Sequence, residues 1–275
     1  MNINTGLYQL ASIKQACLNS GHGPLCLVLC VLLGGCGTDS SVTNPAAPSE
    51  TSGELTVQTS SELTVESLAD GSYRCHPAGT GPFAGILYNH GGLGTDVGGD
   101  LEGVCRSFAE IGYVALSQRR PNSISLNGQL ESVLEGFEAL RAETNVDPNR
   151  LGILGFSRGG LLTLQAAINL GGAVRSIVLC APAHGNGTLE TTVVDVALIQ
   201  ASVRIYVAEN DQQLEGGTVT DHVALSQLVE SALQSAGKDV ELTVYPPYAD
   251  DGHTLFFEVR EPWWSDVSGF FNQTL

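Results

Sequence analysis

The chain is poor in charged residues, and above all in basic ones. Of its 275 residues 15% are charged, and 12 lysines and arginines stand against 29 aspartates and glutamates, a net charge of −17. Because nucleic-acid phosphates are neutralised by Lys and Arg, this balance argues against a nucleic-acid partner. Hydrophobic residues reach 43%, so the low charge does not indicate disorder. The length allows one large domain or two small ones, with a sizeable core.

Long apolar runs and dense cysteine are also lacking. No run of ~18 or more apolar residues occurs, so the sequence contains no ordinary membrane-spanning helix. Seven cysteines are too few for a small scaffold held together by disulfides. No group of histidines, cysteines and carboxylates has the spacing of a zinc site, and we predict neither a metal nor a cofactor.

The first 60 residues differ in character from the rest. A short apolar run over 25–33 has the length of a signal-peptide core, and Leu33-Gly34-Gly35-Cys36 resembles a bacterial lipobox. We predict that 1–35 are a lipoprotein signal peptide and that Cys36 carries the lipid, with a buried strand as the alternative for the apolar run. Residues 36–60, rich in Ser, Thr, Pro, Gly and Ala, are typical of a flexible tether.

This leader predicts an exported protein of the bacterial cell envelope, which contacts the membrane only through a lipid anchor at Cys36. Gly37 follows the cysteine, and by resemblance to lipoprotein sorting this favours the outer membrane if the host has one. Export would also permit a disulfide, for which Cys75 and Cys105 are the candidates. Their spacing does not establish that they meet.

Residues 61–275 form the predicted catalytic domain, in which apolar runs alternate with helical periodicity. Strands are predicted at 62–65, 83–88, 113–116, 150–155, 176–180, 203–207 and 240–245, and helices at 100–111, 130–140, 161–170, 222–236 and 263–273. This alternation indicates an α/β fold with a mainly parallel sheet covered on both faces. Ligand sites of such sheets lie beyond the carboxyl ends of the strands.

A candidate nucleophile stands at one of these strand ends. Gly155-Phe156-Ser157-Arg158-Gly159 lies between a predicted strand and a predicted helix, which is the context of a nucleophile elbow. There the serine occupies a sharp, strained turn, and glycines let neighbouring backbone come close. The alternative is an ordinary turn in which Ser157 caps the helix.

A serine nucleophile needs a base, and the base needs a carboxylate that holds its tautomer. We predict His253, after the last strand, as the base. Asp211, after an earlier strand, is the predicted acid, with Glu209 as the alternative. The chain order Ser157, Asp211, His253 is the α/β-hydrolase order. His222 begins a predicted helix, and we expect it on the solvated surface.

Two backbone N–H groups are candidates to stabilise the oxyanion that the attack creates. One is that of Arg158, directly after the serine. The other is that of Gly92 in the loop Asn89-His90-Gly91-Gly92, with Leu93 as the alternative. The loop lacks the Gly-Lys-Ser/Thr ending of a phosphate-binding P-loop.

Arg119 and Arg120 follow the strand predicted at 113–116. Either guanidinium would bind a substrate carboxylate with two hydrogen bonds. The alternative is that both pair with the many acidic side chains of the protein.

Four segments together resemble the α/β-hydrolase superfamily, in particular its dienelactone-hydrolase-like branch: Tyr88-Asn-His-Gly-Gly92, Gly155-Phe-Ser-Arg-Gly-Gly160, Val207-Ala-Glu-Asn-Asp211 and Gly252-His253-Thr-Leu-Phe256. The resemblance implies a three-layer α/β/α sandwich with a mostly parallel eight-stranded sheet. It also implies a serine hydrolase that cleaves carboxylic esters through a Ser-Asp-His triad and an acyl-enzyme. Dienelactone hydrolases proper carry a cysteine nucleophile and a glutamate in the first of these loops, so we expect a carboxylesterase type.

Two other functions remain open. The pair Gly159-Gly160 also resembles prolyl-oligopeptidase-like peptidases, which would make the protein an amidase or peptidase. A non-catalytic envelope lipoprotein that keeps the hydrolase fold is the third candidate, although a complete triad favours an enzyme. The predicted partner is a small-molecule ester, and the sequence indicates no oligomeric state.

Overall fold

The computed structural model describes residues 62–92, 96–215 and 218–275. The predicted signal peptide 1–35, the lipid-bearing Cys36 and the tether 36–60 lie outside the described residues, as does Leu93. None of the helices in the described ranges combines the length and apolar character needed to cross a lipid bilayer.

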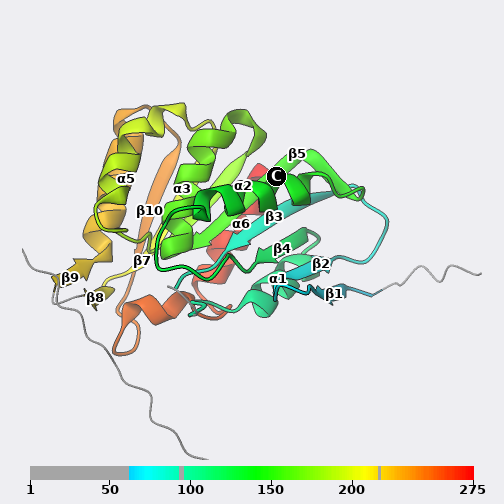
Figure 1. The fold of residues 1–275 in the computed structure, drawn as a ribbon, viewed down its shortest axis with the longest axis horizontal. Helices are drawn as coiled ribbons and strands as arrows, with labels where there is room; N and C mark the ends of the chain where they lie inside the picture. Colours follow the sequence, from blue (N-terminus) through cyan, green and yellow to red (C-terminus); the bar gives the residue numbers. More distant parts are fainter. Residues whose placement is uncertain (1–61, 93–95, 216–217) are drawn as a thin grey trace, which may run out of the picture. The chain divides into compact units, whose positions relative to one another are not determined.

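Within the described residues one sheet has eight strands in the order β1-β2-β4-β3-β5-β6-β7-β10 (Figure 1). Strand β2 pairs antiparallel with both of its neighbours, β1 and β4, and all other neighbouring strands of this sheet pair parallel. The prediction of a mostly parallel eight-stranded sheet is confirmed. The bounds are β1 Thr64–Ser67, β2 Tyr73–His76, β3 Phe83–Asn89, β4 Val114–Gln118, β5 Val146–Phe156, β6 Ser176–Cys180, β7 Ser202–Ala208 and β10 Val240–Tyr245.

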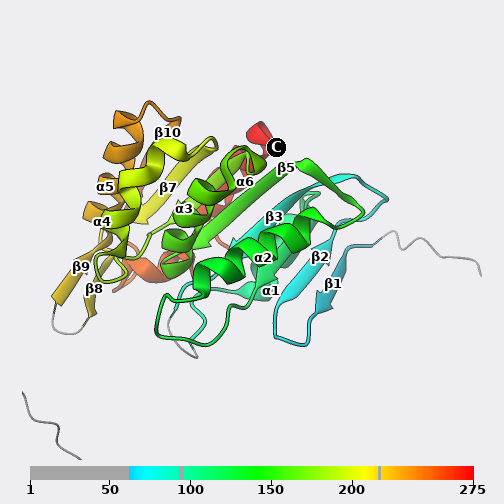
Figure 2. The same ribbon diagram turned by 45° about the horizontal axis from the view of Figure 1, so that its top comes forward.

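Helices cover both faces of this sheet (Figure 2). On one face α1 and α6 pack with an apolar cluster that contains Phe108 and Phe271. On the other face α2, α3 and α5 pack with a second cluster that contains Phe137 and Leu161. The predicted three-layer sandwich is thus confirmed. The helices are α1 Leu101–Glu110, α2 Gln129–Arg141, α3 Arg158–Leu170, α4 Thr188–Thr192, α5 His222–Ser235 and α6 Trp263–Thr274, with 3-10 segments at Gly171–Ala173, Val193–Leu198 and Gly252–Phe256.

A disulfide joins the antiparallel side of the sheet to its covering helix. Cys75 of β2 and Cys105 of α1 are bonded, with their Cα atoms 5.6 Å apart, and both are completely buried. The cross-link therefore fixes α1 against a four-residue strand that lies between β1 and β4.

Parallel pairing brings the candidate catalytic residues to one edge of the sheet. Ser157 directly follows β5, Asp211 follows β7 by three residues, and His253 follows β10 in the 3-10 segment Gly252–Phe256. A small antiparallel hairpin, β8 (Gln212–Glu215) and β9 (Thr218–Asp221), leaves the sheet at Asp211 and returns to the start of α5.

Candidate active site

Ser157 lies in a strained turn between β5 and α3. Its backbone has φ 54° and ψ −118°, a region that residues with a Cβ rarely occupy. Its N–H donates to the Cys180 carbonyl at 2.8 Å, and its carbonyl accepts from the N–H of Ala183 at 3.0 Å. The side chain makes no capping hydrogen bond to α3, so the turn has the features of an elbow and not of an ordinary helix cap.

Neighbouring backbone lies so close to Gly155 and Gly159, the glycines on either side of the serine, that only glycine fits there. A Cβ on Gly155 would lie 2.3 Å from the Gly159 carbonyl oxygen, and one on Gly159 would lie 2.0 Å from that of Asn89. Such distances are well inside van der Waals contact, so no side chain fits at either position. The Gly-x-Ser-x-Gly spacing therefore lets α3 begin directly against both β5 and the loop after β3.

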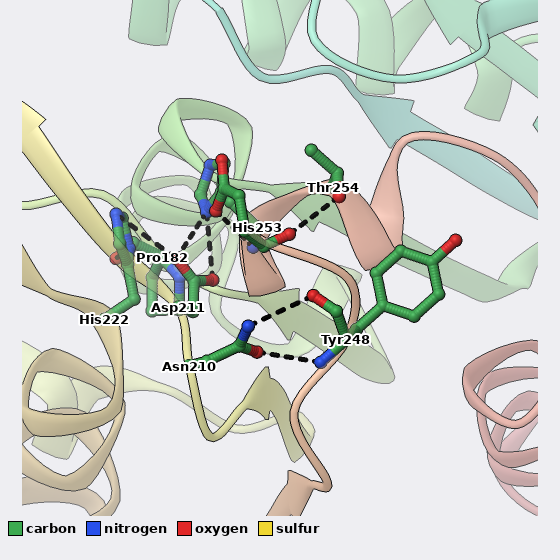
Figure 3. Close-up of polar contacts among 8 residues, drawn as sticks. Pro182, Asn210, Asp211, His222, Tyr248, His253 and Thr254 are labelled. Carbon is green, nitrogen blue, oxygen red and sulfur yellow. Dashed lines mark hydrogen bonds and ion pairs between the residues drawn. The ribbon is translucent and has the colours of Figure 1, made fainter.

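His253 and Asp211 form a buried pair beside this turn (Figure 3). The ring Nδ1 lies 3.0 Å from both carboxylate oxygens, and the residues are 3% and 0% exposed. The carboxylate favours the tautomer with a proton on Nδ1, which leaves the Nε2 lone pair available as a base. Glu209, the alternative acid, is exposed, so the geometry favours Asp211.

Hydrogen bonds join the two loops that carry this pair. The Asn210 amide donates to the Tyr248 carbonyl at 3.1 Å, and the Tyr248 N–H donates back to its oxygen at 2.8 Å (Figure 3). Asp251 accepts the His253 backbone N–H at 2.9 Å. These contacts hold the imidazole in place independently of a substrate.

Ser157 and His253 are neighbours without a hydrogen bond. In the described part of the chain the serine hydroxyl makes none with the imidazole, while the preceding Phe156 packs on that ring with centroids 4.7 Å apart. Hydrogen bonds between catalytic groups are often long until a substrate closes the site. The serine is half-buried, and its Cβ faces the loop of Gly91.

One pocket of about 550 Å³ brings the base and the candidate oxyanion donors together. Gly92, Arg158 and His253 line it, and its apolar wall includes Ile124 and Phe257. Because Arg158 is the first residue of α3, its N–H has no acceptor within the helix and is available to a ligand.

Arg120 makes its hydrogen bonds to neutral groups of the protein. It is buried, and its guanidinium donates to the His90 carbonyl at 2.6 Å and to Gln129 Oε1 at 3.2 Å. Both partners are neutral, so the alternative of an ion pair with an acidic side chain does not describe Arg120, whose Nη1 makes no hydrogen bond within the described residues. Arg120 supports the loop that contains Gly92. Arg119 is exposed and lines a neighbouring pocket of about 450 Å³.

His90 is held neutral in this arrangement. Burial, and next the Arg120 guanidinium, lower the pKa of His90 to about 3. Its Nε2 accepts the backbone N–H of Arg120 at 3.3 Å, so the proton sits on Nδ1 and is donated to the Gly91 carbonyl. The ring thus braces the glycine loop and does not compete with His253 as a base.

The expectation of a surface position for His222 is wrong. The residue is 1% exposed, and its ring centroid lies 4.5 Å from that of His253. The hairpin β8–β9 pairs Gln212 with Asp221, and the His222 N–H then donates to the Asp211 carbonyl at 3.1 Å. A return of the chain over ten residues is a tertiary feature, and helical periodicity gives no sign of it.

The sequence profile of the dienelactone hydrolase family matches residues 125–273, more than half of the chain. The chain belongs to the dienelactone hydrolase family. The matched region contains the Ser157 elbow, Asp211 and His253, so the family assignment covers the residues that the geometry singles out. Membership of this family also supports the conclusion that the protein is a hydrolase.

One curated protein is similar to part of this chain. The uncharacterized peptidase YtmA of Bacillus subtilis (strain 168) is 33% identical over 109 residues, which cover 37% of this chain and 42% of that protein. The chain therefore spans less than half of this curated relative.

Many solved structures resemble this fold, and two of them illustrate the similarity. Esterase Est22 is 16% identical with a TM-score of 0.58, and the similarity covers 78% of this chain and 81% of that one. Porphyromonas gingivalis dipeptidyl peptidase 4 is 15% identical with a TM-score of 0.57, over 78% of this chain and 35% of that one.

Proposed function

We propose that this dienelactone hydrolase family member is a serine hydrolase that cleaves carboxylic esters. Ser157 is the nucleophile, His253 the general base and Asp211 the carboxylate that orients the base. The observation that carries the proposal is the strained Ser157 turn beside a buried His253–Asp211 pair. Both features are costly for folding, and such costs are typical of active sites.

The proposed reaction is acyl transfer to water. Ser157 Oγ attacks the ester carbonyl while His253 Nε2 takes the hydroxyl proton, and Asp211 stabilises the imidazolium. The N–H groups of Gly92 and Arg158 receive the oxyanion. His253 then gives its proton to the leaving alcohol, and a water molecule, deprotonated by the same ring, releases the acyl group.

The two pockets favour a substrate with an apolar part and a polar part. Ile124, Leu126 and Phe257 offer an apolar wall beside His253. The neighbouring pocket includes Arg119, Arg120 and Arg158. Since the Arg120 guanidinium is largely engaged by the protein, we propose Arg119 as the side chain that meets an anionic group of the substrate.

Hydrolysis of amides or peptides is the second candidate. It is favoured by the similarity to the peptidase YtmA over 109 residues. The triad chemistry is the same for both bond types, so the preference rests on the leaving group and on binding.

The test compares matched p-nitrophenyl esters and p-nitroanilides with the same acyl group. We expect kcat/KM to be at least ~100-fold higher for the esters. Ser157→Ala and His253→Ala should abolish turnover, and Asp211→Asn should reduce it by ~10⁴-fold through the wrong histidine tautomer. Preference for the anilides would favour the peptidase, and full activity in His253→Ala would contradict the triad.

We also propose that the protein is exported and anchored by a lipid on Cys36, with the outer membrane favoured where the host has one. The Cys75–Cys105 disulfide supports export, because such bonds persist in oxidising compartments. Labelled palmitate should enter the wild type and not Cys36→Ser, which should leave the membrane fraction. Membrane-bound Cys36→Ser would contradict the anchor.

A further inference from the structure

Asp211 is flanked by two histidines, of which the proposed mechanism uses one. His253 Nδ1 lies 3.0 Å from both carboxylate oxygens, and His222 Nε2 lies 4.0 Å from Oδ1. Figure 3 shows both imidazoles beside the Asp211 carboxylate. One ligand atom from each residue lies within 4.8 Å of the other two, and all three residues are buried.

This donor set has the chemistry of a transition-metal site. Two imidazole nitrogens and a carboxylate oxygen suit Zn²⁺ and its first-row neighbours better than Mg²⁺ or Ca²⁺, which prefer oxygen ligands. Tetrahedral Zn²⁺ holds its ligand atoms about 3.3 Å apart, so the largest separation, which is at most 4.8 Å, has to close by no more than roughly 1.5 Å. Three protein ligands with a fourth position left open are the arrangement of an accessible site, not of a closed structural one.

The surroundings of His222 orient its ring for this role. Its Nδ1 lies 3.3 Å from the Pro182 carbonyl oxygen, an acceptor that fixes the proton on Nδ1. Nε2, the nitrogen that faces Asp211, is then the one with the lone pair. Histidine ligands commonly donate their other N–H to a backbone carbonyl in this way. Of the three residues, His253 borders the pocket of about 550 Å³, and this pocket is the proposed route for an ion.

We propose that Asp211, His222 and His253 form an inhibitory binding site for a divalent transition metal, with Zn²⁺ the best-matched ion. Coordination by His253 Nδ1 moves the single proton of the neutral ring to Nε2. The ring then presents an N–H to Ser157 and has no lone pair to take its proton. This inhibition rests on the proposed function, whereas the binding of the metal does not.

The first test measures binding without activity. Purified Ser157→Ala is titrated with Co²⁺, whose visible absorption reports tetrahedral coordination. One ion per chain should bind, at least ~10-fold more weakly when His222→Gln is added. His184→Gln is the matched control, because His184 is a half-buried histidine outside the three-residue cluster, and its Nε2 lies 2.9 Å from Glu190 Oε1. Absence of binding, or binding lost with His184→Gln and kept with His222→Gln, would overturn the proposal.

The second test measures inhibition of the wild type by Zn²⁺ in the ester assay. The concentration for half inhibition should rise at least ~10-fold in His222→Gln and stay unchanged in His184→Gln. Equal inhibition of wild type and His222→Gln would contradict the site. If the wild type has no ester activity, the proposed function fails, while the Co²⁺ titration still decides the metal site.

A third measurement needs no His222 variant, in case that variant does not fold. Imidazole nitrogen NMR of Ser157→Ala follows the histidine rings as Zn²⁺ is added. Two of them should shift, and His253 should change from the Nδ1–H to the Nε2–H tautomer. Shifts confined to other histidines would refute the ligand set.

Discussion

Replacing His90 with glutamine should reduce the loss of folding stability that the protein shows as the pH falls below neutral. His90 is 6% exposed, and burial together with Arg120 lowers the pKa of the ring to about 3. In the unfolded chain a histidine titrates near ~6.5. Between these values the unfolded state binds a proton that the folded state does not, so stability falls as the pH falls.

The size of this effect follows from the pKa difference. Each pH unit between ~6.5 and about 3 removes about 1.4 kcal/mol from the free energy of unfolding. At pH 4.5 the loss from this one residue is about 3 kcal/mol, and above pH 6.5 it vanishes. Glutamine keeps a donor for the Gly91 carbonyl and an acceptor for the Arg120 N–H, and it does not titrate.

The assay is urea unfolding of both proteins at pH 7.5, 6.0 and 4.5 with the disulfide intact. We expect the wild type to lose about 3 kcal/mol more than His90→Gln between the extremes. Other titrating groups cancel in the comparison because both proteins share them. The assignment of a buried neutral ring would be refuted if wild type and His90→Gln lost the same free energy of unfolding between pH 7.5 and 4.5, or if NMR showed His90 titrating near pH 6.5.

Three further outcomes follow from close contacts. Gly159→Ala places a Cβ 2.0 Å from the Asn89 carbonyl oxygen and should lower the free energy of unfolding in urea by ~3 kcal/mol or more. Gly269→Ala in α6 is the control: its Cβ meets nothing within 4 Å, and it should raise that free energy by ~0.5–1 kcal/mol. Equal effects of the two substitutions would contradict the elbow packing. Cys75→Ser should lower the free energy of unfolding by about 3–4 kcal/mol, since the disulfide closes a 30-residue separation, and an unchanged value would show that the bond does not form. Arg120→Lys cannot hold both the His90 carbonyl and Gln129, so kcat on esters should fall ~10- to 100-fold with little change in KM; a rise in KM alone would indicate a substrate-binding role.

The edge of the sheet that carries the site was predictable because it depends on local patterns. Apolar runs mark the strands, and parallel strands share a carboxyl edge, so the residues after β5, β7 and β10 lie along the same edge of the sheet. That reasoning located Ser157, Asp211 and His253 without knowledge of strand order. The glycines at 155 and 159 were also readable, because their spacing reflects a backbone contact.

The features that sequence reasoning missed depend on tertiary contacts. His222 is buried because the hairpin β8–β9 returns the chain to Asp211, whereas a residue that opens a helix is ordinarily exposed. Arg120 is buried because the loop after β3 presents a carbonyl to it, which chain position alone does not indicate. The sequence did name Cys75 and Cys105 as a candidate pair, but the bond itself depends on α1 packing over β2, and spacing does not encode that contact.

The most direct test of the account is covalent labelling of the nucleophile. The purified protein is treated with a fluorophosphonate, digested, and searched for the adduct by mass spectrometry. We predict one adduct per chain, on Ser157, absent from Ser157→Ala and retained in Ser235→Ala, whose serine is exposed at the end of α5. An adduct on another residue, or ester turnover that persists in Ser157→Ala, would contradict the central claim.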